Sequence, residues 1–161
     1  STRFMTPPTR GYTLLRDAAL QLAVAEDFAK QWINPRQSAP YDYIDSTLTT
    51  PDEDAWTDGP RPGAPLASVK LDDGSHLTDH IAGAFTLFVF DPENALKPLS
   101  TNGFGPMVGV RRSADAAALC AYDAIKGGSY LVRPDAHVCA RWKQITPEKL
   151  GAALDRALAK N

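Results

Sequence analysis

The sequence contains 161 residues, with 17 basic and 19 acidic side chains and a formal net charge of −2 at pH 7. A chain of this length can bury an ordinary hydrophobic core in one domain, and its nearly balanced charge argues against nucleic acid or an anionic membrane as a partner. No apolar run reaches the roughly 20 residues of a membrane-spanning helix, and STRFMTPPTR at the start has no apolar signal core. The composition therefore predicts a soluble, cytoplasmic protein.

The first predicted element is a long helix over residues 12–33. This stretch contains no Gly or Pro, follows a possible Thr9 cap and precedes Asn34-Pro35, which ends it. One side of this helix is an apolar stripe, which needs a partner surface on the same domain, on a second copy or on chain beyond this sequence. A first residue that is Ser rather than Met fits a piece of a longer protein, and equally the removal of an initiator Met. Apolar side chains recur at three- and four-residue steps to form the stripe: Leu15, Ala18, Ala19, Leu22, Ala25, Phe28, Ala29 and Trp32.

Residues 37–63 are rich in Pro, Asp, Thr and Ser, which predicts an irregular connector. The run PDEDAWTDG lacks the ligand rhythm of an EF-hand calcium loop. We therefore expect a solvated acidic surface rather than a cation site. The carboxylates concerned are Asp42, Asp45, Asp52, Glu53, Asp54 and Asp58.

The next segment predicts two strands separated by a turn. Residues 66–71 alternate between apolar and polar, Asp73-Gly74 supplies turn chemistry, and a short helix or loop leads to Phe85–Phe90. The almost continuous apolar run at Phe85–Phe90 indicates a strand buried on both faces, as in the centre of an α/β sheet.

His76, Asp79 and His80 lie between these two strands. On a helix, this spacing would bring three potential metal ligands close together. Without a further anchoring motif the spacing alone does not predict a metal site.

Residues 107–110 are predicted as a third strand, after an irregular segment with a brief helix at residues 93–96. Residues 114–122 could form a helix or a strand, because periodicity does not settle so short an apolar stretch. Gly127-Gly128 is too short and isolated for a phosphate-binding loop and predicts a turn.

A β-hairpin is predicted where residues 130–133 and 137–142 flank the turn residues Pro134-Asp135. Ala136 fits this hairpin less well, because the position usually carries Gly in a left-handed conformation. Strict alternation along the second strand separates two faces, Val138, Ala140 and Trp142 against His137, Cys139 and Arg141.

The chain closes with a predicted helix that should lie on the sheet. Thr146 is its cap, Pro147 takes the first helical position and Glu148 complements the helix dipole. Its apolar stripe consists of Leu150, Ala153, Leu154, Ala157 and Leu158.

Together these elements predict an α/β fold with a mixed sheet flanked by helices, preceded by the long N-terminal helix. Their order resembles the thioredoxin fold, especially its peroxiredoxin-like form. Active members of that class carry a thiol after the central strand, whereas this sequence has Asp91-Pro92-Glu93-Asn94-Ala95 there. Gly128-Ser129 also stands where a proline is expected. The resemblance therefore implies a degenerate thioredoxin-like domain.

Several segments in order resemble the C-terminal region of the FAD-dependent aromatic-ring hydroxylases, the group that contains phenol hydroxylase and 3-(3-hydroxyphenyl)propionate hydroxylase. They are TPPTRGYTLLRDAAL with NPRQS, then GPRPGAPL, LTDHIAGAFTLFVF and YLVRPDAHVCARW, followed by the final helix. This resemblance implies that residues 1–36 end the flavoprotein body, residues 37–63 connect, and residues 64–161 form the thioredoxin-like domain. Ala136 departs from the family, whose turn usually carries Gly.

The same resemblance implies a parent enzyme that reduces FAD with NAD(P)H and uses oxygen to hydroxylate a phenol. The resemblance implies that the catalytic parts lie elsewhere, with FAD on an N-terminal domain whose G-x-G-x-x-G fingerprint is absent from this chain. By the same resemblance, this chain is expected to bind no cofactor or metal and to supply no catalytic residue. Its expected partners are the FAD and substrate domains of the parent and a second copy in a homo-oligomer. The ring substrate, its regiochemistry and the choice of NADH or NADPH depend on residues outside this sequence.

Two other functions stay open at this point. The chain could be a stand-alone thiol protein of the thioredoxin or peroxiredoxin class that uses Cys139 or Cys120. Arg141 and His137, on the strand face predicted for Cys139, could lower its pKa, although a cysteine inside a strand is normally inert. The chain could instead be an interaction module that dimerises through its first helix.

Overall fold

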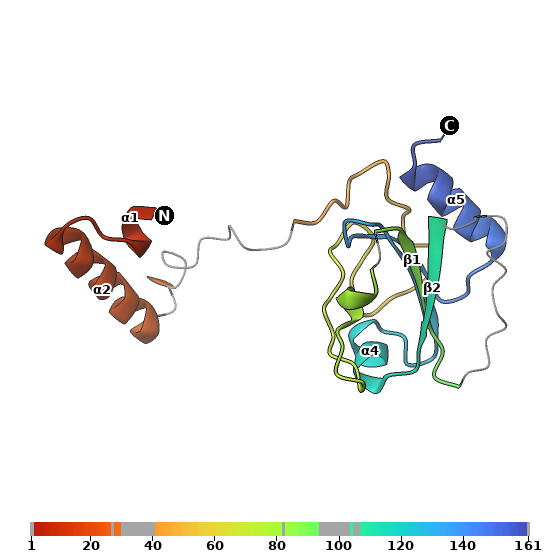
Figure 1. Ribbon diagram of the computed structural model, residues 1–161, viewed down its shortest axis with the longest axis horizontal. Coiled ribbons are helices and arrows are strands. Elements are labelled where there is room, and N and C mark those ends of the chain that lie inside the picture. Colours follow the sequence, from red (N-terminus) through yellow and green to blue (C-terminus); the bar gives the residue numbers. More distant parts are fainter. Residues whose placement is uncertain are drawn as a thin grey trace. The chain divides into compact units, whose positions relative to one another are not determined.

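The computed structural model describes residues 2–26, 28–29, 41–81, 83–93, 104 and 107–160. The chain divides into two compact units, Ser1–Ala39 and Pro40–Asn161 (Figure 1). None of the helices in the described part is long and apolar enough to cross a bilayer.

The first unit contains α1 (Thr2–Met5) and the long helix α2 (Arg10–Ala25). Thr9 caps α2 as predicted, since its hydroxyl accepts a hydrogen bond from the amide of Tyr12. The unbroken helix predicted up to Ile33 is wrong, because the chain leaves the helix after Ala25, where Glu26 is extended with φ −131° and ψ 124°. No Gly or Pro marks this point in the sequence. Residues 28 and 29 are again helical, and the predicted end at Ile33 lies outside the described residues. Asn34-Pro35 and Trp32 lie outside the described residues.

The apolar stripe of α2 is largely uncovered. Within this helix only Ala23 is buried, whereas Leu15 on the predicted stripe is 63% exposed. The other exposed large apolar side chains of the helix are Tyr12, Leu14, Leu20, Leu22 and Val24.

The second unit is built on a four-stranded sheet in the order β2-β1-β3-β4. The central strand β1 (Phe85–Phe90) is buried along its whole length, as predicted. It pairs in parallel with β2 (Val108–Ser113) and antiparallel with β3 (Gly128–Val132), and β3 pairs antiparallel with β4 (Val138–Trp142). The mixed α/β sheet predicted from the sequence is therefore confirmed, with β2 longer than its predicted residues 107–110.

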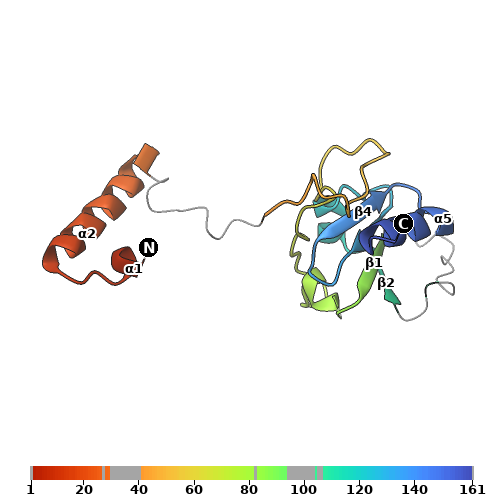
Figure 2. The same cartoon turned by 90° about the horizontal axis from the view of Figure 1, so that it is seen from above.

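Helices cover the two faces of this sheet. On one face α5 (Pro147–Ala157) packs its Leu150, Ala153 and Leu154 into a cluster that also holds side chains of all four strands. Figure 2 shows α5 beside β4. On the other face α4 (Ala116–Ala121) and residues 66–81 cover a cluster rich in aromatic rings. These rings are Phe88, Phe90, Tyr122 and Tyr130.

Both helices of this unit begin at side-chain caps. Thr146 caps α5 by accepting from the amide of Lys149, with Pro147 at its start, as predicted. Asp115 caps α4 by accepting from the amides of Ala117 and Ala118, which decides the open choice for residues 114–122 in favour of a helix. The brief helix predicted at residues 93–96 falls mostly outside the described residues.

The strand predicted over residues 66–71 is wrong. The chain here forms only two isolated β-bridges, Pro65 with His137 and Lys70 with His76. The first bridge joins it to the hairpin, and the second joins it to the residues that follow its own turn. The 3-10 helix η2 (Leu77–His80) follows it. The predicted turn at Asp73-Gly74 is confirmed, with Gly74 at φ 86° and its amide bonded to the carbonyl of Leu71.

The predicted hairpin forms, but a β-bulge changes which side chains share a face. Leu131 pairs with Ala140 while Val132 pairs with Val138, so Cys139 is the extra residue. Cys139 and Ala140 consequently pack on the α5 side, and Val138 packs on the opposite side. The strict alternation predicted for this strand is therefore wrong.

Ala136 occupies the left-handed region, with φ 65°. Its amide donates to the carbonyl of Arg133, and its carbonyl accepts from the amide of Leu66. The hairpin thus imposes the conformation that usually selects Gly, and Ala136 accepts the strain.

Residues 41–63, which we call the acidic strap, lie along the outer edge of β4. The amide of Thr50 donates to the carbonyl of Cys139, and the amide of Gly63 donates to the carbonyl of Val138. The segment is largely exposed to solvent, as predicted, with Asp45, Asp52, Glu53 and Asp58 all exposed. Some of its carboxylates also bind positive or N–H groups of the sheet, of α5 and of the strap itself. Asp52 pairs with Arg141, Glu53 with Lys149, Asp42 with Arg61, and Asp54 accepts from the amide of Lys143.

Candidate functional site

Cys139, one of the two candidate thiols, is only 1% exposed, inside the core. Its Sγ donates to the carbonyl of Leu131 at 3.3 Å. Burial raises the pKa of this thiol to about 12, so it stays protonated at neutral pH and is a poor nucleophile.

The side chains expected to activate Cys139 point elsewhere, because the bulge separates it from them. Arg141 is directed into the acidic strap, where its guanidinium is bidentate to Asp52. The His137 ring lies 3.3 Å from the carbonyl oxygen of Tyr41 and 3.1 Å from that of Asp135. Cys120 is exposed on α4 and its side chain has no hydrogen-bond partner among the described residues.

The Arg141 contacts are structural. Its Nη1 lies within 3.3 Å of the carbonyl oxygens of residues 58, 59 and 60, and its guanidinium stacks over the Trp56 ring at 4.6 Å from the centroid. With only 7% of its side chain exposed, Arg141 fastens the strap to the sheet. The Lys143 Nζ also lies over the Trp56 ring, 3.6 Å from its centroid.

Asp91 follows β1 at the position where the thioredoxin resemblance expects a catalytic thiol. Its side chain is buried, its amide donates to the carbonyl of Ser113, and its carboxylate lies 3.2 Å from Nη1 of Arg112. An ion pair between the buried Asp91 carboxylate and the partly exposed Arg112 side chain therefore links the ends of the parallel strands at this position.

The three potential metal ligands are used locally. Asp79 accepts from the amide of His76 at 2.8 Å, and the His80 Nε2 lies 3.3 Å from the Ser75 hydroxyl. Across the described residues, no group of three His, Cys, Asp or Glu side chains converges on a metal position.

The glycines of this unit do not form a dinucleotide-binding loop. Gly127 has φ 92° in a turn, and a Cβ on Gly128 would come within 3.3 Å of the Trp56 ring. The pair leads into strand β3, whose first residue is Gly128, instead of following a strand and opening a helix. Gly127 and Gly128 therefore do not fit the pyrophosphate of FAD.

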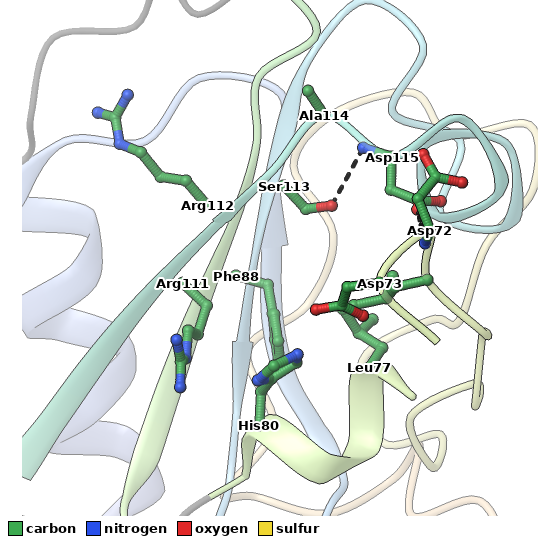
Figure 3. A pocket seen from close by; sticks show the side chains of 11 residues that line it. Asp72, Asp73, Leu77, His80, Phe88, Arg111, Arg112, Ser113, Ala114 and Asp115 are labelled. Carbon is green, nitrogen blue, oxygen red and sulfur yellow. Dashed lines mark hydrogen bonds between the residues drawn. The ribbon is translucent and has the colours of Figure 1, made fainter. Parts of the chain in front are cut away.

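Several hollows on the second unit combine charged groups of both signs, and one of them has a volume of about 520 Å³. It lies on the aromatic face of the sheet, near the carboxyl ends of β1 and β2 (Figure 3). Arg111 lies on one side of Phe88 and Asp73 on the other. We call it the Arg111 hollow; it is lined by Leu71, Asp72, Asp73, Leu77, His80, Phe88, Arg111, Arg112, Ser113, Ala114 and Asp115.

The sequence did not reveal this hollow. The predicted third strand ends at residue 110, before Arg111, and Asp73 is predicted only as part of a turn. Pairing of Phe88 with Arg111 in the sheet register brings these parts together.

The chain is thus an α/β protein of two units, in which the Cys139 thiol is buried and protonated and no metal cluster forms among the described residues. No protein-family model and no curated protein matches the sequence significantly.

Solved structures match the fold. The substrate-free rebeccamycin biosynthetic enzyme RebC aligns with a TM-score of 0.58 and 20% identity, over 94% of this chain and 28% of its own. The flavin-dependent monooxygenase PieE, in complex with FAD and substrate, aligns with a TM-score of 0.61 and 22% identity, over 99% of this chain and 31% of its own. Aklavinone-11 hydroxylase, in a complex with FAD and aklavinone, aligns with a TM-score of 0.56 and 21% identity, over 90% of this chain and 34% of its own.

The chain thus has the fold of one portion of these flavin-dependent enzymes and spans about a third of their length. The resemblance predicted from the sequence is confirmed at the level of the fold.

Proposed function

We propose that this chain is the non-catalytic C-terminal part of an FAD-dependent monooxygenase that hydroxylates aromatic, phenolic compounds with NAD(P)H and O2. The observation that carries this proposal is the asymmetry of the structural matches. They cover at least 90% of this chain but no more than 34% of each flavoprotein chain. The remaining two thirds of such an enzyme would hold FAD and the substrate.

The chemistry of the described residues supports the same division of labour. The position after β1 carries the Asp91–Arg112 ion pair in place of a thiol, and the thiol of Cys139 is protonated at neutral pH. In the parent, FAD would supply electron transfer from NAD(P)H and activation of O2, and this chain would supply packing surfaces.

The two units are proposed to differ in role. The exposed apolar stripe of α2 would pack on the flavin-binding body, because a helix with such a stripe is stable only when another surface covers it. The second unit has its own core and would cover the body and contribute to subunit contacts. Its parallel pair followed by an antiparallel hairpin supports the thioredoxin-like assignment.

The test is to isolate the polypeptide containing this sequence from its native source and to measure its mass and absorption spectrum. We expect a polypeptide about three times as long as this chain, by the coverage of the matches, with the absorption of oxidised flavin. The control is the 161-residue chain produced alone, which should be colourless. A native, colourless protein of 17.4 kDa would overturn the proposal.

A further inference from the structure

The starting observation is an arginine without a partner. In the second unit, Arg61, Arg112, Arg133 and Arg141 each bind an aspartate, whereas Arg111 and Arg156 bind none among the described residues. Arg111 lines the hollow that bears its name, and its guanidinium has no hydrogen-bond or ion-pair partner among the described residues. On β2, the next residue on the same face is Ser113 in one direction and Gly109 in the other, so its own strand places no carboxylate beside it.

The Asp73 carboxylate lies on the opposite side of the hollow, and only one of its two oxygens accepts hydrogen bonds from the described residues. Oδ1 of Asp73 accepts from the amide and the hydroxyl of Ser75, at 2.9 and 2.6 Å. These bonds lower the pKa of Asp73, so it is ionised at neutral pH. Its Oδ2 has no hydrogen-bond partner among the described residues, and the carboxylate is directed toward the hollow (Figure 3).

Arg111 and Asp73 do not pair with each other, although both line the same hollow. Its volume of about 520 Å³ is in the range of small-molecule sites, roughly 300–1,000 Å³. The hollow also lies near the carboxyl ends of parallel strands, where α/β proteins commonly bind ligands.

We propose that the Arg111 hollow binds a small zwitterionic molecule, with its carboxylate on the Arg111 guanidinium and its ammonium group on the Asp73 carboxylate. A guanidinium recognises a carboxylate through paired charge-assisted hydrogen bonds. A simple anion would meet the carboxylates of Asp72 and Asp115 as well, and a simple cation would meet Arg111 itself. This site is independent of the proposed role in a monooxygenase.

The experiment uses the 161-residue chain and a series of ω-amino acids of increasing length: glycine, β-alanine and γ-aminobutyrate. Acetate and ethylamine, each carrying one of the two charges, are the reference ligands at the same ionic strength. Calorimetry and amide NMR should show that at least one amino acid binds about tenfold more tightly than either reference, which corresponds to about 1.4 kcal/mol. The shifted amides should be those of residues 72–75 and 111–115.

Arg111→Gln should weaken this binding by at least about tenfold, because the bidentate contact is lost. Arg156→Gln is the matched control, since Arg156 is an exposed arginine of α5 that does not line this hollow; it should leave binding unchanged. Asp73→Asn tests the other end and should weaken the amino acid but not acetate.

Three results would each overturn the site: no amide shifts at millimolar ligand, acetate binding as tightly as the amino acids, or equal binding by Arg111→Gln. A wild-type-like amide spectrum of each variant outside the two segments verifies that it is folded. If Arg111→Gln does not fold, Arg111→Lys keeps the charge without the paired donors, and unchanged binding by that variant would overturn the site.

Discussion

Helices α2 and α5 have the same kind of sequence and opposite surroundings. Both begin at a threonine cap and carry apolar side chains at three- and four-residue spacing. In α5, Leu154 is 3% exposed against the sheet, whereas Leu15 of α2 is 63% exposed. An apolar stripe therefore indicates that a helix needs a covering surface; α5 finds one within its own unit, whereas the described residues of the first unit leave the stripe of α2 largely uncovered.

The second unit supplies its own cover. Its sheet has a hydrophobic cluster on each face, and the acidic strap closes the edge of β4. Among the described residues, the first unit contains the short helix α1 and the longer helix α2. One short helix offers too little surface to cover the apolar stripe of α2.

The largest expected effect separates the two helices directly. Leu154→Ala should lower the free energy of unfolding by about 3 kcal/mol, because it leaves a cavity in the core. Leu15→Ala should change it by less than about 0.5 kcal/mol, as expected for an exposed position. Urea unfolding followed by circular dichroism measures both. Equal losses would show that α2 is covered within this chain.

The Leu15→Ala substitution also tests the proposed function. In the full-length parent, the stripe of α2 would be buried, so Leu15→Ala should there cost about 2–5 kcal/mol, as Leu→Ala does in cores. An unchanged parent would argue that α2 faces solvent.

A second comparison concerns ion pairs in the two units. Arg141→Ala should cost about 2 kcal/mol, because Asp52 and three backbone carbonyls lose a buried donor. Partial exposure of Asp52 keeps the loss below that of a fully buried pair. The control is Arg16→Ala in α2, whose pair with Asp17 is half exposed and should be worth less than about 0.5 kcal/mol.

Proteolysis gives an independent reading of the Arg141 prediction. Loss of Arg141 should speed cleavage within residues 41–63, because the strap loses its principal anchor. Arg141→Lys should protect only in part, since an ammonium group lacks the planar fork of donors. Cleavage at the wild-type rate would contradict the assigned role.

Alkaline pH should lower the stability of the second unit, because its buried cysteine and tyrosine side chains keep their protons in the folded chain. Burial raises the pKa of Cys139 and of Tyr130 to about 12, and it raises that of Tyr122 as well. The unfolded chain loses these protons first, from about pH 9 upward, so it binds fewer protons than the folded chain and the free energy of unfolding falls as pH rises.

Urea unfolding between about pH 8 and 11 measures this fall. Tyr130→Phe should reduce its slope, because one titrating group is gone, although it also removes the hydrogen bond to the carbonyl of Tyr122. A flat profile would contradict the burial of these groups.

The smallest expected effect is a gain. Ala136→Gly should stabilise the second unit by about 0.5 kcal/mol, because relief of the left-handed strain exceeds the added entropy of the unfolded chain. Thermal unfolding can detect it, and Ala140→Gly in the regular part of β4 is the control that should destabilise. A loss on Ala136→Gly would show that the turn carries little strain.

Local patterns predicted the elements whose environment repeats along the chain. The apolar run of Phe85–Phe90 required burial on both faces, Thr146-Pro147 fixed the start of α5, and the hairpin followed from its turn residues. The fold resemblance came from the order of such segments. No pattern predicted the end of α2 at Ala25, where neither Gly nor Pro interrupts the helix.

What the sequence determined by itself is therefore the buried central strand, the hairpin, the capped C-terminal helix and the class of fold, because these depend on residues a few positions apart. The tertiary structure alone decided the bulge at Cys139, the partners of the acidic strap and the Arg111 hollow. Asp52 and Arg141 are 89 residues apart, and Phe88 meets Arg111 only through strand register. Contacts of that kind are set by how the sheet folds together, and no local spacing encodes them.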